Sequence, residues 1–451
     1  MDAGSRYDVH KWRLESLINE ILLTQHKPGL MPFNCLSYGA VADFSNSLQK
    51  LEVAEDSILF KSGADVLKQL PRLIHRQFEW QRGFLHRSQI YRSLFIYGHT
   101  DCAKYFLDRY RIPLVKFFNC GFAFYAVCLN SPGFASDYNF TMVGIDDATR
   151  DIAIGLLSMS HAQATIEAKQ LRKNQTHAAY QKSILRTAPI ISFGPNQERL
   201  RAPLPALIAW RITAGLYYYM IRGGDHISRE IGERFETYCF ELSKHMLSGF
   251  DVGSGVEYKL RGKPVHSPDV LIRDGGKVIA VIECKAKKMT FEAKFADDPI
   301  AEAKIGYAEI AKGIFQLWRF FSHCRQSLTG SELAADAVGI VVTLDNWLEM
   351  SSELRNLVMK IASDMANGDN DIEISDRKDI AFCSIEELEV TLQHASPDEF
   401  IKAARESVSP RFFGWNLSGV HRELTNGSNR HNRFPFDDRL VDLNPAFRQP
   451  V

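Results

Sequence analysis

The stretch from Asp269 to Lys285 constrains the fold more than any other part of the chain. Two apolar runs, 269–273 and 278–285, flank the tetrapeptide Asp274-Gly275-Gly276-Lys277. A glycine pair between two such runs is typical of a tight β-hairpin turn. The second run begins with five consecutive apolar residues, 278–282, as expected for a strand buried on both faces. The sequence therefore predicts an antiparallel hairpin whose second strand ends at Glu283-Cys284-Lys285.

Strand alternation decides which polar residues of this hairpin share a face. Glu283 and Lys285 point the same way and Cys284 points the opposite way. A two-residue Gly275-Gly276 turn pairs residue 274 with 277, and that register would set Asp269 opposite Ile282, on the face away from Glu283. We therefore expect either a three-residue loop, with Asp269 opposite Val281 and Gly276 left-handed, or a compensating bulge. The apolar face would then consist of Val270, Ile272, Ala280 and Ile282.

Asp269 and Glu283 are the residue types that hold a magnesium ion. Mg²⁺ accepts few protein ligands, prefers oxygen and keeps several waters, and Mn²⁺ can substitute for it. The backbone carbonyl of Cys284 would supply a further oxygen. Such an ion lowers the pKa of a bound water, and Lys285 would orient that water or stabilise the transition state. The alternative is a surface hairpin in which Glu283 forms a salt bridge with Lys285 or Lys287.

Ser267-Pro268-Asp269 followed by Glu283-Cys284-Lys285 resembles the PD-(D/E)xK superfamily of restriction-endonuclease-like nucleases, over about residues 226–345. In that family a preceding helix often supplies another acidic residue in a G-x-x-x-E pattern, which Gly232 and Glu236 match here. Glu236 is therefore a further catalytic and metal-binding candidate, although a solvent-facing helix carboxylate is an open alternative. Weaker candidates on the same segment are Glu230 and Glu233.

Some members also carry a Q-x-x-x-Y element on the following helix. Gln316 matches its glutamine, whereas Phe320 stands in place of the tyrosine. The resemblance implies an α/β fold with a restriction-endonuclease-like core, in which helices flank a mixed central sheet. It also implies a Mg²⁺-dependent DNA nuclease, expected to be an endonuclease. Joined to an unfamiliar second domain, such a core resembles bacterial restriction and anti-phage defence effectors. The alternatives are a non-cleaving nucleic-acid-binding or assembly module and a partner-dependent nuclease subunit.

The length of 451 residues indicates more than one domain. Four prolines between 188 and 205 mark a boundary. We expect a separate mixed α+β N-terminal domain over 1–203, with a role in recognition, sensing or oligomerisation. A nuclease domain over 204–405 and a C-terminal tail over 406–451 would follow.

Individual elements are expected from local composition. Strands are expected at 93–97 and 115–129 because these segments are rich in aromatic and β-branched residues. A polar helix is expected over 162–185 and a hydrophobic helix over 204–222, ending at Gly223-Gly224. The central Arg211 of that hydrophobic helix favours burial inside the protein over a membrane span.

The formal net charge is zero, but the charge is unevenly distributed. Residues 61–120 hold 11 Lys/Arg against 4 Asp/Glu, with aromatic residues between them. That mixture is typical of nucleic-acid contacts, and equally of a core in which the aromatic residues are buried. The candidate DNA-binding residues are Arg82, Arg87, Arg92, Lys287 and Lys288.

The cysteines and the N-terminus bear on the compartment. Eight cysteines are scattered without a C-x-x-C pair, which argues against a disulfide framework or a structural zinc site. The first residues carry charges where a signal peptide needs an apolar segment. We therefore expect a cytoplasmic protein with no membrane partner, which could act as a homo-oligomer or with a partner subunit.

Overall fold

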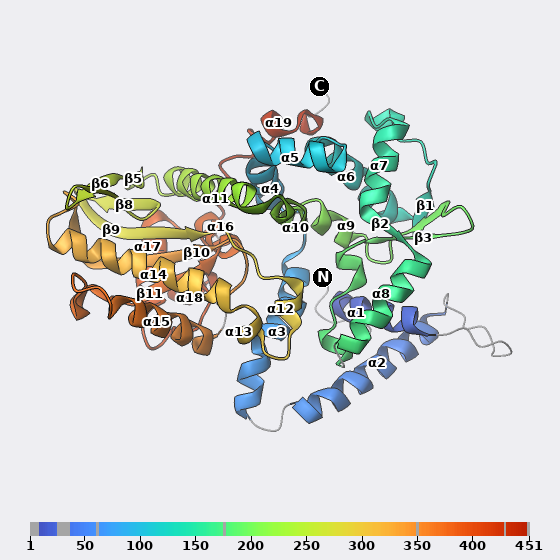
Figure 1. The fold of residues 1–451 in the computed structure, drawn as a ribbon, viewed down its shortest axis with the longest axis horizontal. Coiled ribbons are helices and arrows are strands. Elements are labelled where there is room, and N and C mark those ends of the chain that lie inside the picture. The colour runs from blue at the N-terminus through green and yellow to red at the C-terminus, as the bar shows by residue number, and fades with distance from the viewer. Residues whose placement is uncertain are drawn as a thin grey trace. The chain divides into compact units, whose positions relative to one another are not determined.

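The computed structural model describes residues 9–24, 37–59, 63–174, 177–348, 351–427 and 430–448. The chain is a mixed α/β protein in which helices predominate, and its sheets combine parallel and antiparallel strands (Figure 1). It divides into two compact units. The first unit comprises Met1–His86, Thr100–Arg222 and Lys294–Asp297, and the second comprises Arg87–His99, Gly223–Ala293 and Asp298–Val451.

The first unit is largely helical, with one small sheet. Its α-helices are α1 Lys11–Leu23, α2 Tyr38–Leu59, α3 Gly63–Arg82, α5 Thr100–Tyr110, α6 Leu114–Asn130, α7 Asp147–Leu157, α8 His161–Asn174, α9 Ala206–Arg211 and α10 Tyr217–Met220. Its 3₁₀ helices are η1 Thr141–Val143, η2 Ala178–Tyr180, η3 Ile184–Arg186 and η4 Ala214–Leu216, and η5 Ile221–Gly223 ends it. The strands β1 Gly133–Ala135, β2 Ser158–Ser160, β3 Ile190–Phe193 and β4 Arg199–Arg201 lie in the order β1-β4-β3-β2.

Several expected elements differ from those observed. The strands expected at 93–97 and 115–129 are wrong: these segments lie in helices α4 Arg87–Tyr97 and α6. In α6 the buried apolar residues recur at spacings of three and four, which a helix needs and a strand does not. The helix expected over 162–185 is present only as far as Asn174 in α8, with 3₁₀ turns further on. The helix expected over 204–222 is broken into short pieces, because Thr213 has non-helical angles (φ −121°, ψ −101°).

Buried ion pairs occupy the interior of the first unit. Arg186 donates two hydrogen bonds to Glu15, at 2.9 Å from Nε and 2.7 Å from Nη2, and also pairs with Glu79. Arg76 is buried and pairs with Glu52. Arg76, from the basic stretch of residues 61–120, therefore serves the interior of this unit.

The second unit contains a five-stranded sheet and the helices on its two faces. Its α-helices are α4, α11 Gly224–Met246, α12 Phe291–Phe295 (of which Lys294 and Phe295 belong to the first unit), α13 Pro299–Glu302, α14 Lys304–Arg325, α15 Ser352–Ala366, α16 Ile385–His394, α17 Pro397–Glu406, α18 Leu417–Leu424 and α19 Leu440–Leu443. The strands are β5 Asp251–Ser254, β6 Glu257–Leu260, β7 Lys263–His266, β8 Val270–Asp274, β9 Lys277–Lys285, β10 Glu332–Thr343 and β11 Ile380–Ser384. Two 3₁₀ helices are η6 Ile374–Asp376 and η7 Pro445–Phe447.

The sheet has the order β11-β10-β9-β8-β5 and is mixed. Strand β10 runs parallel to β9 and β11, whereas β8 is antiparallel to both β9 and β5. Helices α14 and α15 cover one face, packing with Leu271, Val281 and Val341 in a shared core. Helix α11 lies on the other side of β8 and β9 (Figure 1). Strands β6 and β7 form a separate two-stranded ribbon.

The division into units differs from the boundaries expected at 203/204 and 405/406. Residues 204–222 belong to the first unit, whereas 87–99 and the C-terminal segment belong to the second. Aromatic packing explains the placement of the C-terminal segment: Phe436 is buried and stacks on Tyr91 of α4, with ring centroids 4.8 Å apart. Helix α18 also packs against α16 and α17.

Among the described helices, none is by itself both long and apolar enough to span a membrane. Helices α5 and α6 satisfy the length and composition criteria only as a pair, and they are bent by 68° at their junction.

Candidate functional site

The β8–β9 hairpin forms as predicted, with the compensating bulge and not the three-residue loop. Gly275 and Gly276 form a two-residue turn with φ of 53° and 84°, and Asp274 pairs with Lys277. The register then shifts between Ile272 and Arg273, which leaves Ile279 as the extra residue of β9. Beyond the shift Val270 pairs with Ile282, so the next pair along the strands is Asp269 with Glu283. Both carboxylates therefore share one face of the hairpin.

Hydrogen bonds hold these side chains at the end of the sheet. Asp269 Oδ2 accepts the backbone N–H of Cys284 at 2.7 Å. Lys285 Nζ donates to Glu283 Oε1 at 2.7 Å and to Gln316 Oε1 at 2.8 Å. Gln316 comes from α14, so the structure brings four of the five predicted catalytic side chains, Asp269, Glu283, Lys285 and Gln316, into one hydrogen-bonded neighbourhood.

Gly313 makes room for this arrangement. It lies on α14, one turn before Gln316. A Cβ atom at this position would fall 2.8 Å from Lys285 Cε and 3.3 Å from Glu283 Cγ. Sequence reasoning missed this residue, although a glycine inside an otherwise apolar helix is a signal of close packing.

Burial and mutual repulsion raise the pKa values of the acidic groups. Glu283 is 3% exposed, and burial raises its pKa to about 7, with Asp269 adding to the rise and Lys285 opposing it. Burial and the negative charge of Glu236 raise the pKa of Asp269 to about 7. Burial alone would lower the pKa of Lys285, but the charge of Glu283 outweighs it and the pKa is raised.

Glu236, the fifth predicted catalytic residue, stands on α11 beside the other two carboxylates. Burial and the charge of Glu283 raise its pKa to about 7. Glu236 and Asp269 line the same cleft, which has a volume of about 460 Å³. The cleft is lined by Glu233, Glu236, Thr237, Phe240, Ser254, Gly255, His266, Ser267 and Asp269. The half-buried Glu236 and Asp269 therefore open onto a polar cleft.

The charges of this site fit a divalent cation. Three largely buried carboxyl groups face a single ammonium group, that of Lys285, so their ionised forms carry an uncompensated negative charge. Among the described residues no three His, Cys, Asp or Glu side chains are arranged as a ready metal-binding group. Mg²⁺ needs only one or two carboxylates with water, and Asp269 and Glu283 are placed to supply them. The Cys284 thiol is buried on the opposite face near Cys239, which leaves its carbonyl as the only candidate ligand atom of that residue.

The predicted nucleic-acid contacts fall into different environments. Lys287 is exposed and Lys288 half-buried just after β9, and Arg82 is half-buried in the first unit. Arg87 is 65% exposed and pairs with Asp437 at 2.7 Å. Arg92 is buried and binds the carboxylates of Glu389 and Glu386, which leaves it no surface for a phosphate.

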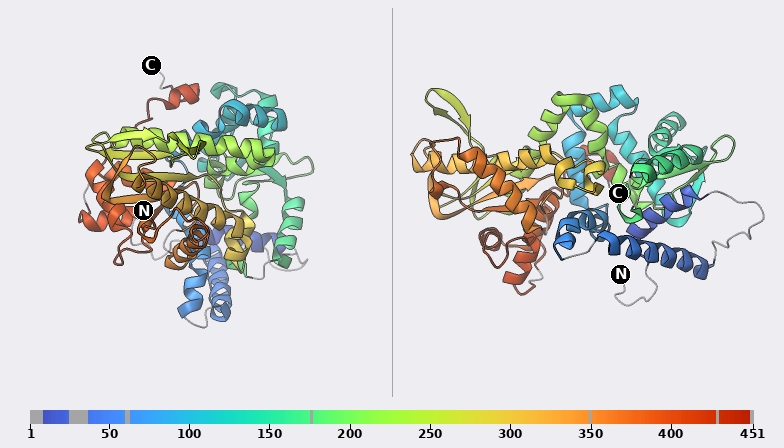
Figure 2. Two further views of the ribbon diagram at one scale, coloured as in Figure 1. Left: turned by 60° about the vertical axis from the view of Figure 1, so that its left-hand side comes forward. Right: turned by 60° about the horizontal axis from the view of Figure 1, so that its bottom comes forward.

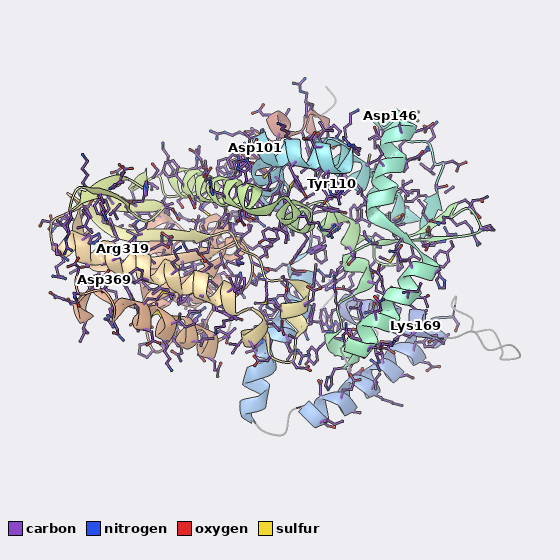
Figure 3. All side chains as sticks on the ribbon, in the orientation of Figure 1. Asp101, Tyr110, Asp146, Lys169, Arg319 and Asp369 are labelled. Carbon is purple, nitrogen blue, oxygen red and sulfur yellow. The ribbon has the colours of Figure 1, made fainter. Side chains whose placement is uncertain are left out.

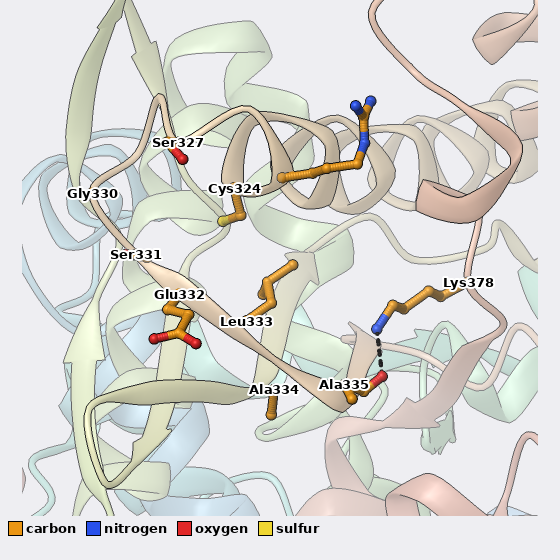
Figure 4. A pocket seen from close by; sticks show the side chains of 10 residues that line it. Cys324, Ser327, Gly330, Ser331, Glu332, Leu333, Ala334, Ala335 and Lys378 are labelled. Atoms are coloured by element: carbon orange, nitrogen blue, oxygen red, sulfur yellow. Dashed lines mark hydrogen bonds between the residues drawn. The ribbon is translucent and has the colours of Figure 1, made fainter.

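The second unit has a further cleft, of about 560 Å³, at the start of β10 (Figure 4). Lys378 Nζ donates to the carbonyl of Ala335 at 3.0 Å across it. Glu332 is the carboxylate that lines this cleft, and it pairs with Lys277 at 2.5 Å. This cleft has no paired acidic side chains, so the cleft at Asp269 is the better candidate.

Comparison of the chain with protein-family models, with curated proteins and with solved structures gives no match.

Proposed function

We propose that this protein is a Mg²⁺-dependent nuclease that hydrolyses phosphodiester bonds of DNA at the Asp269–Glu283–Lys285 site. One observation carries the proposal: a strand bulge at Ile279 puts Asp269 and Glu283 on one face, beside a lysine fixed by Gln316. The mixed sheet with α11 and α14 on opposite sides supports a restriction-endonuclease-like core.

Each side chain has a role that its contacts support. Asp269 and Glu283 would hold the cation, with Glu236 contributing from α11. Bound Mg²⁺ would stabilise negative charge on the phosphate. Lys285 would donate to a phosphate oxygen or orient the attacking water, and Gln316 keeps its ammonium group directed at the site. The polar cleft lined by Glu236 and Asp269 would admit water to the site.

The broader setting is part of the same proposal. We infer a cytoplasmic endonuclease that acts in restriction or anti-phage defence, as a homo-oligomer or with a partner subunit. Mn²⁺ would replace Mg²⁺ because both prefer oxygen ligands.

The test is a cleavage assay on linear, circular and single-stranded DNA and on RNA, with Mg²⁺, Mn²⁺ or EDTA. Asp269→Ala and Lys285→Ala should abolish the cleavage seen with the native protein, and EDTA should do the same. Matched controls are Asp251→Ala and Lys277→Ala, which remove exposed charges from the same sheet and should retain activity.

Two outcomes would contradict the proposal. Cleavage that persists in both site variants would show that the chemistry lies elsewhere. No cleavage by the native protein, with DNA binding retained, would favour a non-cleaving module or a partner-dependent subunit. Cutting of the circular DNA distinguishes an endonuclease from an exonuclease.

A further inference from the structure

The β6–β7 ribbon is a projecting arm that begins at the candidate cleft. It leaves the sheet after β5 and returns just before β8, and at its base Ser267 N–H donates to the carbonyl of Val256 at 2.9 Å. Arg261 and Gly262 form its two-residue turn, with φ of 51° and 78°. Its base residues His266 and Ser267 line the same cleft as Asp269. Figure 2 shows the ribbon extending from the edge of the second unit.

One face of the arm is attached to α14. Tyr258 forms a hydrogen bond of 2.6 Å between its Oη and His323 Nδ1, and its ring packs against the core that α14 shares with the sheet. Strand alternation directs Lys259 to the opposite, outward face. Lys259, Arg261 and Lys263 are all exposed.

The cations on and beside the arm have few counter-charges. Lys259 and Lys263 form no ion pair with any carboxylate of the described residues, and Arg261 has only a 3.5 Å contact with Asp371 at 80% exposure. Lys312 and Arg319 of α14 likewise form no ion pair with a carboxylate of the described residues. Arg319, labelled in Figure 3, lies one turn after Gln316 in sequence, and its charge lowers the pKa of Glu283 at longer range. Elsewhere in the second unit arginines such as Arg92 and Arg325 are paired with carboxylates.

We propose that the β6–β7 arm, with Lys312 and Arg319 of α14, is a binding surface for duplex DNA that holds the substrate against the cleft. The inference rests on the proposed nuclease function for its substrate but concerns a separate surface. A group of exposed cations is complementary to a phosphate backbone, from which it releases counterions. A two-stranded ribbon fits the major groove of B-DNA. With four residues in each strand, the arm is about 14 Å long.

The arm favours a duplex over a single strand. Single-strand binding depends on aromatic rings on which bases stack. The only tyrosine of the arm, Tyr258, is used against His323 and the core. The outward face presents Glu257, Lys259, Pro264 and His266, so its only ring besides that of proline is His266, which lies 4.0 Å from Glu257. Arg261 lies in the turn, and Lys263, which pairs with Leu260, is exposed at the end of the face that carries Tyr258.

The test measures DNA binding by the full chain carrying Asp269→Ala, in EDTA, so that cleavage cannot interfere. The arm variant adds Lys259→Glu, Arg261→Glu and Lys263→Glu. The matched control adds Lys360→Glu, Lys402→Glu and Arg422→Glu, which reverse three exposed cations on α15, α17 and α18 of the same unit. Fluorescence anisotropy would be recorded with a duplex and with a single strand of equal length, over a range of salt concentrations.

We expect the arm variant to bind the duplex at least about 10-fold more weakly, with a salt dependence shallower by about two to three ions. The control should bind within about twofold of the parent protein. A neutral variant, Lys259→Gln with Arg261→Gln and Lys263→Gln, should show an intermediate loss. An unchanged melting temperature in this neutral variant would show that its weaker binding comes from lost DNA contacts and not from unfolding.

Equal duplex binding by the neutral arm variant and the control would overturn the inference, and so would tighter binding of the single strand by the parent protein. The outcome is independent of the cleavage assay. If the native protein cuts nothing while the arm variants lose duplex affinity, the nuclease proposal fails and the arm inference stands. If the native protein cuts DNA while both arm variants bind the duplex normally, the arm inference fails and the nuclease proposal stands.

Discussion

The three acidic residues at the candidate site repel one another when they are ionised. Glu236, Asp269 and Glu283 each have a pKa raised to about 7, first by burial and then by one another. Lys285 compensates only one negative charge. In the absence of metal the folded protein therefore favours the protonated carboxyl groups, and this preference has a measurable dependence on pH.

The stability of the metal-free protein should fall as the pH rises toward and through about 7. A carboxyl whose pKa is higher in the folded than in the unfolded protein contributes stability below its unfolded pKa of about 4, and loses that contribution as the pH rises past about 7. Under the proposed metal assignment Mg²⁺ would bind the ionised form, so the increase in melting temperature on adding Mg²⁺ should be larger at pH 8.5 than at pH 6. Thermal unfolding with and without Mg²⁺ measures this difference.

The variant Glu283→Gln should lose most of the Mg²⁺ effect and its pH dependence, because it removes one of the repelling charges. Asp251→Asn, at an exposed carboxylate of β5, should behave as the native protein. An equal effect of Mg²⁺ at both pH values would contradict the metal assignment.

Gly313 offers a test of the position of Lys285 that leaves the chemistry of every side chain intact. In Gly313→Ala the new methyl group meets the flexible end of Lys285, 2.8 Å from Cε, and should displace it from Glu283 and Gln316. We expect cleavage to fall by about 10- to 100-fold, as expected for small misplacements of catalytic groups. The gain in helix propensity, about 1 kcal/mol, should keep the stability close to that of the native protein.

The control for this variant is Gly155→Ala on α7, where a Cβ meets no atom within 4 Å. It should gain helix propensity without any loss of cleavage. Full activity of Gly313→Ala would argue against a catalytic position for the Lys285 ammonium group.

At the scale of elements, the turn of the β8–β9 hairpin determines where the site residues point. Both Gly275 and Gly276 are left-handed, which strains an ordinary L-residue. We expect Gly276→Ala to lower the free energy of unfolding by about 1–2 kcal/mol. Gly275→Asn should be nearly neutral, because asparagine followed by glycine is a favoured pair in this turn. Chemical denaturation of the two variants measures the difference, and equal losses would contradict the assigned turn.

The hairpin also marks how far the sequence predicts structure. Its turn and its strands follow from local signals, the glycine pair and the apolar runs. The bulge at Ile279 has no such signal, because it arises in a strand that must pair with β8 on one side and β10 on the other, and the β10 pairing shifts at the same place. Strand alternation required either a bulge or a three-residue loop to bring Asp269 and Glu283 onto one face. The pairing of β9 with its two neighbours decided in favour of the bulge.

Elements whose identity depends on tertiary burial were harder to predict. Helices α4 and α6 contain the aromatic and apolar residues of strands, and both are buried along much of their surface. In such segments composition does not separate a buried helix from a strand. For the site, the sequence identified Glu236 and Gln316 through the family pattern, whereas Gly313 and the arm became apparent only from the contacts of α14.

At the scale of the whole molecule, the uneven charge of the sequence has two different structural uses. The basic residues between 61 and 120 are shared between the two units. Arg72, Arg76 and Arg92 are buried, and each pairs with a carboxylate. The exposed cations of the arm come instead from the segment 255–294, in which the sequence holds 9 Lys/Arg against 5 Asp/Glu. The basic excess at 61–120 therefore includes arginines that form buried ion pairs, whereas the cations of the β6–β7 arm lie on the surface.

Arg92 provides the final test of this distinction. It is buried beside Glu389, which also accepts a hydrogen bond of 2.6 Å from Tyr238 Oη. In Arg92→Ala the Glu389 carboxylate would lose its cation in a buried setting, so we expect the free energy of unfolding to fall by about 3–5 kcal/mol. Arg87→Ala breaks an exposed pair with Asp437 and should cost less than about 1 kcal/mol.

Denaturant unfolding monitors both variants, and DNA affinity is measured under conditions where each is folded. A structural role for Arg92 predicts unchanged DNA affinity in the folded fraction. The double variant Arg92→Met with Glu389→Leu should recover much of the lost stability, because a buried ion pair is often replaceable by apolar residues of similar volume. If Arg92→Ala instead weakened DNA binding without lowering stability, the guanidinium would have to reach the surface, and the burial of α4 in the second unit would be contradicted.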